Sequence, residues 1–499
     1  MSITGPGSIT AANVAAQNSM MNQLNTLAQQ LGSGQAAQTY SDLQSQAGVA
    51  LSLSGQLSDI NGYSATAQTV GATLSVAQSA LSELDGVSNS IQQTIGEQSG
   101  FTLNANGQTT TQAEAATQLG NILSLLNTQV GDNYIFSGSA LNQPSVASES
   151  DILNGNGAQA GLTQVISERQ QADLGTSGLG HLSATTSGST VTLSQDGTPF
   201  GFQLSGVDSS LAGATVTGPS GSPPAIAVDL GSNPNNGDTI QLQLTLPDGS
   251  TQAISLQATT NSPPGANQFT IGASPSVTAG NLQTALTTAI GSLAQTALPA
   301  ASAMAAADNF FSDPPQRVNG SPADASTGLV NGTPADTVFW YTGDDSTTPA
   351  RQTATAQVGP SMAIDYGMRA NEQALTTLVA NVAVLAATTY SPSDSNAQAN
   401  YQALSQKVAG NLGGQSGNQT IDDIETDLAN AQTTVSNATT LNTQTQTTLQ
   451  QMMQDIDGVN QNQIGEEILT LQNSLSASMS VSARLAQLSL VNYLGPVSG

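Results

Sequence analysis

The chain has 499 residues, of which 33 are acidic and 6 are basic, so its net charge at pH 7 is -27. It has no cysteine and one histidine, which excludes disulfides, thiolate metal sites, cysteine nucleophiles and multi-histidine metal sites. The six basic residues are scattered, so we expect no nucleic acid as a partner.

The first seven residues carry no basic or apolar segment of the kind found in secretory signal peptides. No apolar run approaches the roughly 18 residues that a membrane span requires, so we expect no membrane insertion. Aromatic residues make up 3% of the chain, which favours thin helices with alanine-rich seams or small β-domains over one bulky core. An acidic chain without cysteine is typical of an exposed or exported protein.

The first third of the chain is predicted to be helical. A helix capped by Ser8 or Thr10 runs to Leu31 and ends at the glycines of residues 32–34. From about Asp42 to residue 97, apolar residues then recur at steps of three and four, which is typical of a coiled-coil seam. The residues assigned to this intrasubunit seam are Leu53, Leu57, Ile60, Val70, Leu74, Leu81 and Leu84. A shorter helix over 111–128 and a short strand in the segment 133–138 follow.

The middle of the chain contains most of the prolines and alternates in the manner of strands. The predicted elements are a hairpin over 191–204 around Asp196 and Gly197, a strand over 225–230, a hairpin of strands 239–246 and 252–258, a helix over 278–308, and a strand over 337–342 with the only tryptophan.

The last third returns to helix, with predicted helices over 368–388 and 394–411. A second long seam runs from residue 421 to residue 456, is interrupted at Asp457 and Gly458, and is followed by a final helix ending near residue 494. The seam residues here are Ile424, Leu428, Val435 and Leu449.

One apolar stripe cannot bury itself, so the two long seams are expected to pack on each other. The predicted class is therefore α+β multidomain: terminal helices form coiled-coil-like helical domains, and a central β-rich insertion lies between them. The predicted domains are an N-terminal core helix (1–34), the N-terminal half of a long-helix domain (35–140), central variable β-rich outer domains (141–362), the C-terminal half of the long-helix domain (363–457) and a C-terminal core helix (458–499).

The two outermost helices are separated from the long seams by the breaks at 32–34 and 457–458. Few intrachain partners remain for their apolar faces, and exposed apolar stripes mark interaction sites. We therefore expect these faces to contact other copies of the chain. The predicted polymer-contact residues are Val14, Met20, Met21, Leu24, Leu27, Leu31, Ile468, Leu471, Leu475, Leu485 and Leu488.

The acidic pairs at 344–345 and 422–423 are interpreted as structural, because one lies in a polar turn and the other near a helix N-terminus. His181 lies in a loop rich in serine and glycine and is expected to be solvated. We therefore predict no catalytic residues, no metal site and no cofactor.

Three segments resemble the flagellin family, which includes filament flagellins and the hook–filament junction protein (hook-associated protein 3). They are Leu24-x-x-Leu27-x-x-x-Leu31-Gly-Ser-Gly34, Asn133-Tyr-Ile-Phe-Ser-Gly138, and the closing helix with Ile464-Gly-Glu-Glu-Ile-Leu-Thr-Leu-Gln-Asn-Ser-Leu and Ser489-Leu-Val-Asn-Tyr-Leu494. The resemblance covers a little over half of the chain. It implies a secreted structural protein that is exported by the flagellar type III apparatus with a chaperone. The subunit then polymerises into an extracellular filament for motility, in contact with hook-associated and cap proteins.

Two alternatives remain open at this stage. The junction protein shares the helical ends, and the Asn133–Gly138 motif favours it. A surface adhesin that binds through the central β region is the alternative from a different class.

Overall fold

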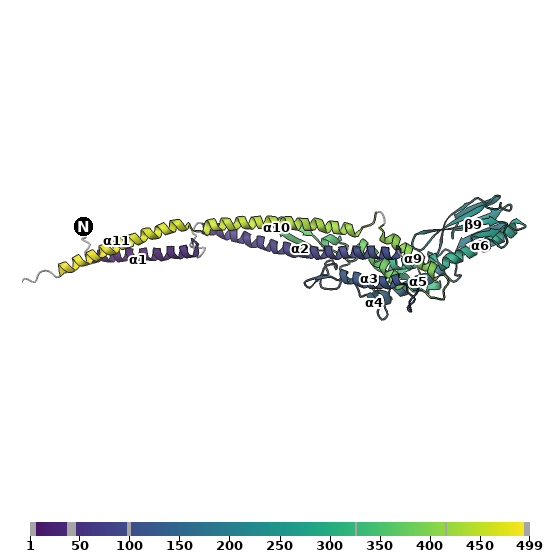
Figure 1. Ribbon diagram of the computed structural model, residues 1–499, viewed down its shortest axis with the longest axis horizontal. Helices are drawn as coiled ribbons and strands as arrows, with labels where there is room; N and C mark the ends of the chain where they lie inside the picture. The colour runs from purple at the N-terminus through teal and green to yellow at the C-terminus, as the bar shows by residue number, and fades with distance from the viewer. Residues whose placement is uncertain (1–5, 37–45, 97–100, 325–326, 415–416, 494–499) are drawn as a thin grey trace, which may run out of the picture. The chain divides into compact units, whose positions relative to one another are not determined.

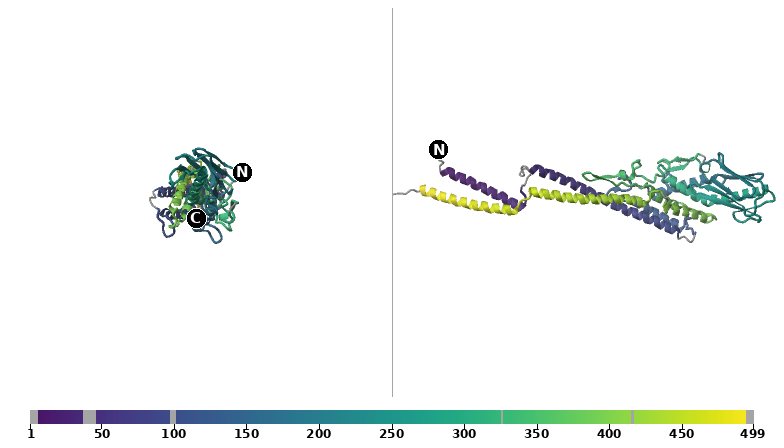
Figure 2. Two further views of the ribbon diagram at one scale, coloured as in Figure 1. Left: turned by 90° about the vertical axis from the view of Figure 1, so that its right-hand side faces the viewer. Right: turned by 90° about the horizontal axis from the view of Figure 1, so that it is seen from above.

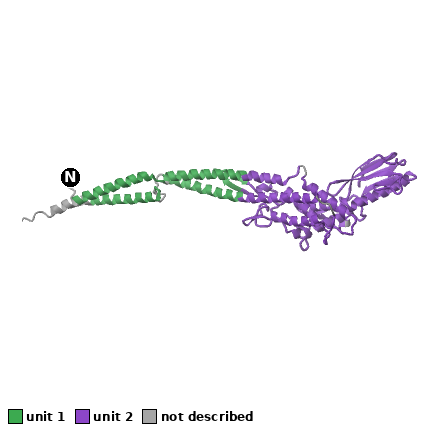
Figure 3. Cartoon of the chain, in the orientation of Figure 1, with its two compact units in different colours: residues 1–71, 356–364, 433–499 green, residues 72–355, 365–432 purple. Residues whose placement is uncertain are grey.

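The computed structural model describes residues 6–36, 46–96, 101–324, 327–414 and 417–493. The fold is mixed α and β, with helices toward both ends of the chain and the sheets in the middle, as the sequence predicts (Figure 1). The chain forms two compact units (Figure 3). Unit 1 comprises residues 1–71, 356–364 and 433–499, and unit 2 comprises residues 72–355 and 365–432.

Unit 1 is built mainly from helices that come from opposite ends of the sequence. Helix α1 (Pro6–Ser33) lies alongside α11 (Gln461–Tyr493), as Figure 1 and the right-hand view of Figure 2 show. The N-terminal part of α2 (Ala47–Gly96) packs against the C-terminal part of α10 (Ile421–Asp457). These bounds agree with the predicted helices, although the predicted starting point at Asp42 and the predicted end at residue 494 lie outside the described residues.

The two predicted helix breaks meet each other in unit 1. Gln35 forms an isolated antiparallel bridge with Gly458, and the Val459 N–H donates to the Gly34 carbonyl oxygen at 3.3 Å. Gly34 has φ +73°, a conformation that glycine adopts without steric cost. The breaks therefore form a connection between helices α1 and α11.

The short strands β13 (Thr355–Gly359) and β14 (Met362–Asp365) form a two-stranded sheet. The C-terminal end of β13 lies against α10, where the side-chain N–H of Asn442 donates to the Val358 carbonyl oxygen at 2.9 Å. Asn442 is 2% exposed, so this hydrogen bond satisfies a buried polar group and ties the sheet to the helix.

The helical part of unit 2 contains two nearly buried helices, α7 (Ala297–Phe310) and α8 (Gln373–Ala387). Both are rich in alanine, so their backbones can approach neighbouring helices closely. The same part of unit 2 also contains α3 (Thr110–Leu126), α4 (Glu149–Asn154), α5 (Leu162–Leu174) and α9 (Ala397–Leu412). Short strand pairs accompany them: β1 (Gln129–Val130) with β2 (Asn133–Tyr134), and β11 (Gln316–Val318) with β12 (Leu329–Asn331).

The β-rich part of unit 2 contains two four-stranded sheets with the orders β3-β4-β7-β6 and β10-β9-β8-β5. Their apolar faces share one core with helix α6 (Pro275–Gln295), centred on residues such as Leu193, Leu242 and Leu286. The strands are β3 (Leu182–Ser187), β4 (Thr190–Gln195), β5 (Gln203–Ser209), β6 (Ala214–Ser220), β7 (Ala225–Leu230), β8 (Thr239–Thr245), β9 (Thr251–Thr259) and β10 (Gln268–Thr270). All pairs are antiparallel except β10 with β9.

Three predictions for this region need correction. The hairpin over 191–204 is wrong, because β3 and β7 occupy both edges of β4, and β5 pairs with β8 in the other sheet. The helix predicted over 278–308 is two helices divided at Thr296. The segment 337–342 is not a strand, since only single residues there form bridges, to Ala160 and Val146. The strand β7 and the hairpin of β8 and β9 are confirmed.

Within the part of the chain that the structure describes, none of the helices combines the length and apolar character needed to span a bilayer.

Candidate assembly surface on the terminal helices

Helices α1 and α11 contact each other through side chains spaced three and four residues apart. These positions are half-buried, whereas most of the intervening residues are exposed. This spacing keeps one stripe of each helix facing its partner. The apolar residues at these positions are Met20, Leu24 and Leu27 on α1, and Ile464, Ile468, Leu471 and Leu475 on α11, of which Ile464 is the most buried, at 6% exposed.

Polar side chains interrupt this stripe. The side-chain N–H group of Gln17 donates to the hydroxyl oxygens of Ser478 at 3.4 Å and Ser482 at 3.0 Å. Together with the bridge from Gln35 to Gly458, this contact defines an antiparallel register for α1 and α11. The pair is thus held by a thin, partly polar contact, and it leaves much of each helix exposed.

The intrachain pairing changes the interpretation of the predicted polymer-contact residues. The expectation that their apolar faces have few intrachain partners is wrong for the half-buried residues, because α1 and α11 cover one another there. Whether these residues also contact other copies stays a prediction. The side chains of Leu485 and Leu488 lie outside the described residues.

A second set of apolar side chains on the same two helices is exposed. We call it the terminal apolar surface. Its members are Val14 (53% exposed), Met21 (45%), Leu31 (38%), Leu469 (61%), Met479 (44%) and Val481 (53%). The sequence interpretation did not include the last three among the polymer-contact residues, and Leu469 and Val481 lie off the three-and-four stripe that it followed. An apolar residue on the outer side of an amphipathic helix is the signal that identifies them.

Exposed apolar side chains concentrate in unit 1. Among the described residues, ten of the fourteen large exposed apolar side chains belong to unit 1, although unit 2 is the larger unit. The terminal helices are also nearly neutral: α1 has no charged residue, and α11 has Glu466, Glu467 and Arg484, for a net charge of -1. The remaining -26 of the total of -27 therefore lies elsewhere in the chain.

The residues assigned to the two long seams are buried, apart from the half-buried Leu57. In unit 1, Leu53, Ile60 and Leu449 form one apolar cluster, which joins α2 to α10. In the same unit Val70 is 2% exposed and Val435 is 4% exposed. The seam residues in unit 2 are Leu74, Leu81 and Leu84 on α2, and Ile424 and Leu428 on α10, all with no measurable exposure.

The Asn133–Gly138 motif lies inside unit 2, against the segment that precedes α8. The Gly138 N–H donates to the Met368 carbonyl oxygen at 2.9 Å, and the Ala370 N–H donates to the Phe136 carbonyl oxygen at 2.8 Å. Phe136 is fully buried. The motif therefore joins the first third of the chain to the last third, which its local sequence did not reveal.

An ion pair holds this junction. The Arg369 guanidinium donates to an Asp344 carboxylate oxygen at 2.7 Å and to the Ser346 carbonyl oxygen at 2.8 Å. Burial alone would raise the pKa of Asp344, but hydrogen bonds from the Ser346 backbone and from Arg369 outweigh it and hold that pKa well below its usual range. Asp344 thus has a structural role, as predicted, although its partner was not foreseen.

The environment of His181 corrects a further prediction. Its side chain is 9% exposed, with Nδ1 2.5 Å from an Asp196 carboxylate oxygen and Nε2 2.6 Å from the Ala172 carbonyl oxygen. The expectation that His181 is solvated is wrong, because α5 and the glycine at 175 pack directly against the ring. Both ring nitrogens are engaged by structural contacts.

The acidic pair at 422–423 lies in the first turn of α10, near the helix N-terminus as predicted. Asp423 accepts a hydrogen bond from the Thr420 N–H at 2.9 Å, and the Asp423 N–H donates to the Thr420 hydroxyl at 3.2 Å. This reciprocal arrangement caps the helix. Among the described residues, no group of three or more histidine, aspartate or glutamate side chains is arranged to hold a metal ion.

Comparison with known proteins returns no matching family model and no matching curated protein. The resemblance to the flagellin family therefore rests on the three segments quoted above.

Proposed function

We propose that this chain is the structural subunit of a bacterial flagellar filament, which polymerises outside the cell and supports motility. The observation that carries the proposal is the terminal apolar surface, which lies on two nearly neutral helices of a strongly acidic chain. Like charges repel when copies of such a chain approach, so contacts between copies are favoured where charge is least. We further propose that the paired terminal helices form coiled-coil-like domains, with the β-rich region as a separate outer domain.

The exposed side chains point in more than one direction. Met479 and Val481 are two residues apart, and 3.6 residues per turn places them about 200° apart around α11. A single partner helix cannot cover both. A subunit inside a polymer has neighbours on several sides, and this distribution suits it better than a simple dimer.

Burying one of these exposed side chains against another copy contributes a modest free energy. Complete burial of a valine, leucine or methionine contributes about 1.5–3 kcal/mol, and these side chains are about half exposed, so each contributes on the order of 1 kcal/mol. A polymer repeats such weak contacts between many copies, so their small contributions add up.

The resemblance implies the remaining partners of the proposed subunit. They are the flagellar type III export apparatus, its chaperone, and the hook-associated and cap proteins. No cofactor is part of the proposal.

Seeded polymerisation tests the proposed function. Purified protein is mixed with sheared fragments of its own filaments, and elongation is followed by electron microscopy and sedimentation. The variant Val481→Ser should polymerise poorly at concentrations where the unchanged chain elongates, with thermal unfolding of the monomer unaltered. The matched control is Val277→Ser on α6, since Val277 is 50% exposed in unit 2. Equal elongation by both variants, or failure of the unchanged chain to elongate at all, refutes the proposal.

The hook–filament junction protein is the second candidate, and the Asn133–Gly138 motif favours it. A filament subunit is the bulk protein of sheared filaments, whereas a junction protein is present at a few copies per filament. Quantitative mass spectrometry of sheared filaments distinguishes the two roles.

A further inference from the structure

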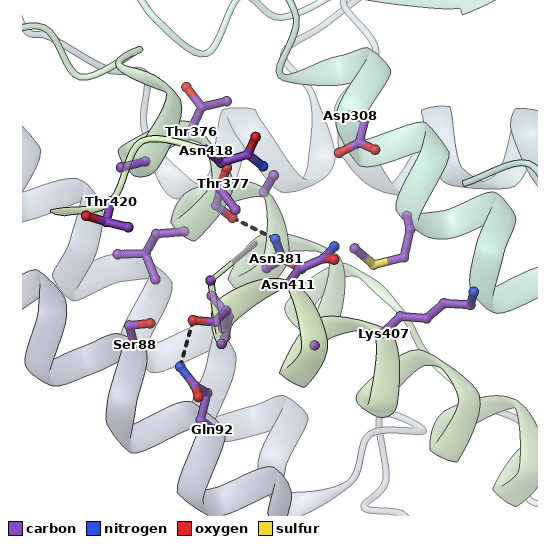
Figure 4. A pocket seen from close by; sticks show the side chains of 18 of the residues that line it. Ser88, Gln92, Asp308, Thr376, Thr377, Asn381, Lys407, Asn411, Asn418 and Thr420 are labelled. Atoms are coloured by element: carbon purple, nitrogen blue, oxygen red, sulfur yellow. Dashed lines mark hydrogen bonds between the residues drawn. The ribbon is translucent and has the colours of Figure 1, made fainter. Parts of the chain in front are cut away.

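A cavity of about 1090 Å³ lies within unit 2. Its walls come from the C-terminal part of α2, from α7, α8 and α9, and from the turn between β8 and β9. Figure 4 shows Gln92, Asp308, Asn381 and Lys407, one from each of these four helices, around this space. The cavity is large enough for a small organic molecule.

One buried side chain in the wall has an unsatisfied acceptor. Asn381 is 3% exposed, and its Nδ2–H donates to the Thr377 carbonyl oxygen at 2.8 Å. Its Oδ1 atom has no hydrogen-bond partner among the described residues. Because buried polar atoms are almost always paired, this oxygen indicates a place for a ligand that donates a hydrogen bond. The atom exposes less than 1 Å² in the unliganded chain, so a donor can reach it only if the wall around Asn381 rearranges on binding.

The charges around the cavity favour a cation. Four carboxylates line it, from Asp85, Asp248, Asp308 and Asp422, against the single ammonium group of Lys407. That ammonium is already engaged, with Nζ 2.6 Å from an Asp248 oxygen and 2.6 Å from the Ser250 hydroxyl. Three carboxylates are therefore left without a neutralising cation in the cavity.

Asp308 is the carboxylate of the cavity whose pKa is raised, although its side chain is exposed to solvent. It accepts no hydrogen bond from any residue in the described part of the chain. Desolvation, and secondly the neighbouring Asp248 carboxylate, raise the pKa of Asp308. A cation bound beside it offsets both effects, because its charge stabilises the ionised carboxylate.

We infer that this cavity binds a small organic amine, whose ammonium group pairs with Asp308 and whose N–H donates to Oδ1 of Asn381. A metal ion fits less well, because the described residues contain no group of three carboxylates or histidines arranged to coordinate one. A neutral sugar satisfies the oxygen of Asn381 but leaves the carboxylates uncompensated. The inference is independent of the proposed role in filaments.

Isothermal titration calorimetry of the full chain with spermidine at 150 mM salt tests the inference. We expect one saturable site per chain. Asp308→Asn and Asn381→Leu should each weaken it at least tenfold. Asn381→Leu should change the melting temperature little, since it removes an unpaired buried oxygen together with the one hydrogen bond from Nδ2 to the Thr377 carbonyl oxygen. The matched control is Asp208→Asn on β5, because Asp208 is exposed and does not line the cavity.

Three outcomes overturn the inference. The first is the absence of saturable binding. The second is an equal effect of Asp208→Asn and Asp308→Asn, since the amine is then attracted by the acidic surface alone. The third is tighter binding of sucrose or Mg²⁺ than of spermidine under the same conditions, which assigns the cavity to another class of ligand.

Discussion

Replacing Gly138 with alanine tests the junction between the first and last thirds of the chain. Gly138 has φ +64°, and a Cβ atom added to it would lie 2.9 Å from the Asp344 Cβ and 3.2 Å from the Arg369 Nε. Two effects should therefore add. The left-handed backbone conformation costs an alanine about 1–2 kcal/mol. Carbon atoms prefer separations of about 3.5–4.0 Å, so the close approach to Asp344 costs a further ~1–3 kcal/mol.

Gly131 supplies a matched control. It also has φ +64°, but a Cβ atom there would meet nothing within 4 Å. Gly131→Ala should therefore lose only the backbone contribution of about 1–2 kcal/mol. The difference between the two variants isolates the packing at the Asp344 and Arg369 ion pair.

Urea unfolding followed by tryptophan fluorescence measures both variants. Trp340 is the only tryptophan, is 3% exposed and belongs to unit 2 with both glycines, so its emission reports unfolding of that unit. Equal losses of unfolding free energy in the two variants would refute the reasoning, because the close contact at Gly138 would then have no energetic effect.

Three further predictions concern unit 2. Arg369→Ala should lower the unfolding free energy by about 1.5–3 kcal/mol, because it removes the charged hydrogen bond to the partly buried Asp344 carboxylate, which keeps only its contacts with Ser346, whereas the exposed Arg484→Ala should change it by less than about 0.5 kcal/mol. The pKa of Asp344 is lowered in the folded chain, so its contribution is complete above the unfolded value of about 3.9 and is lost as the pH falls through the folded value. Urea titrations between pH 5 and pH 3 should therefore show falling stability, with a shallower decline in Asp344→Asn. Leu84→Ala should cost about 2–5 kcal/mol in thermal unfolding, against less than about 1 kcal/mol for the exposed Val76→Ala on the same helix, and similar costs would contradict the burial of the seam.

Much of the secondary structure could be predicted because its signals are local. The steps of three and four in α2 and α10 identify helices with one buried stripe, and that burial is observed along both. Strict alternation in β8 and β9, with a turn at Asp248 and Gly249, identifies a hairpin that the structure contains. Glycines at the helix breaks mark the ends of α1 and α10 equally well.

The sequence did not reveal which strands pair with each other or what Trp340 packs against. The turn at Asp196 and Gly197 was recognised, but β4 and β5 lie in different sheets, since β3 and β7 pair with the two edges of β4 and β5 pairs with β8. The extended segment around Trp340 was taken for a strand, yet the indole N–H donates to the Phe311 carbonyl oxygen and the ring is buried between helices and loops. Both outcomes depend on contacts with segments elsewhere in the chain, such as β7 for β4 and Phe311 for Trp340.

The terminal helices show the same division. By itself, the sequence determined that both ends of this chain are long, nearly uncharged helices with an apolar stripe, since periodicity and charge are properties of neighbouring residues. Only the tertiary structure decided that α1 and α11 cover part of those stripes within one chain, and that Leu469, Met479 and Val481 remain exposed. The physical reason is that burial depends on which surface meets which, and residues more than 400 positions apart make that contact, as from Gln17 to Ser482.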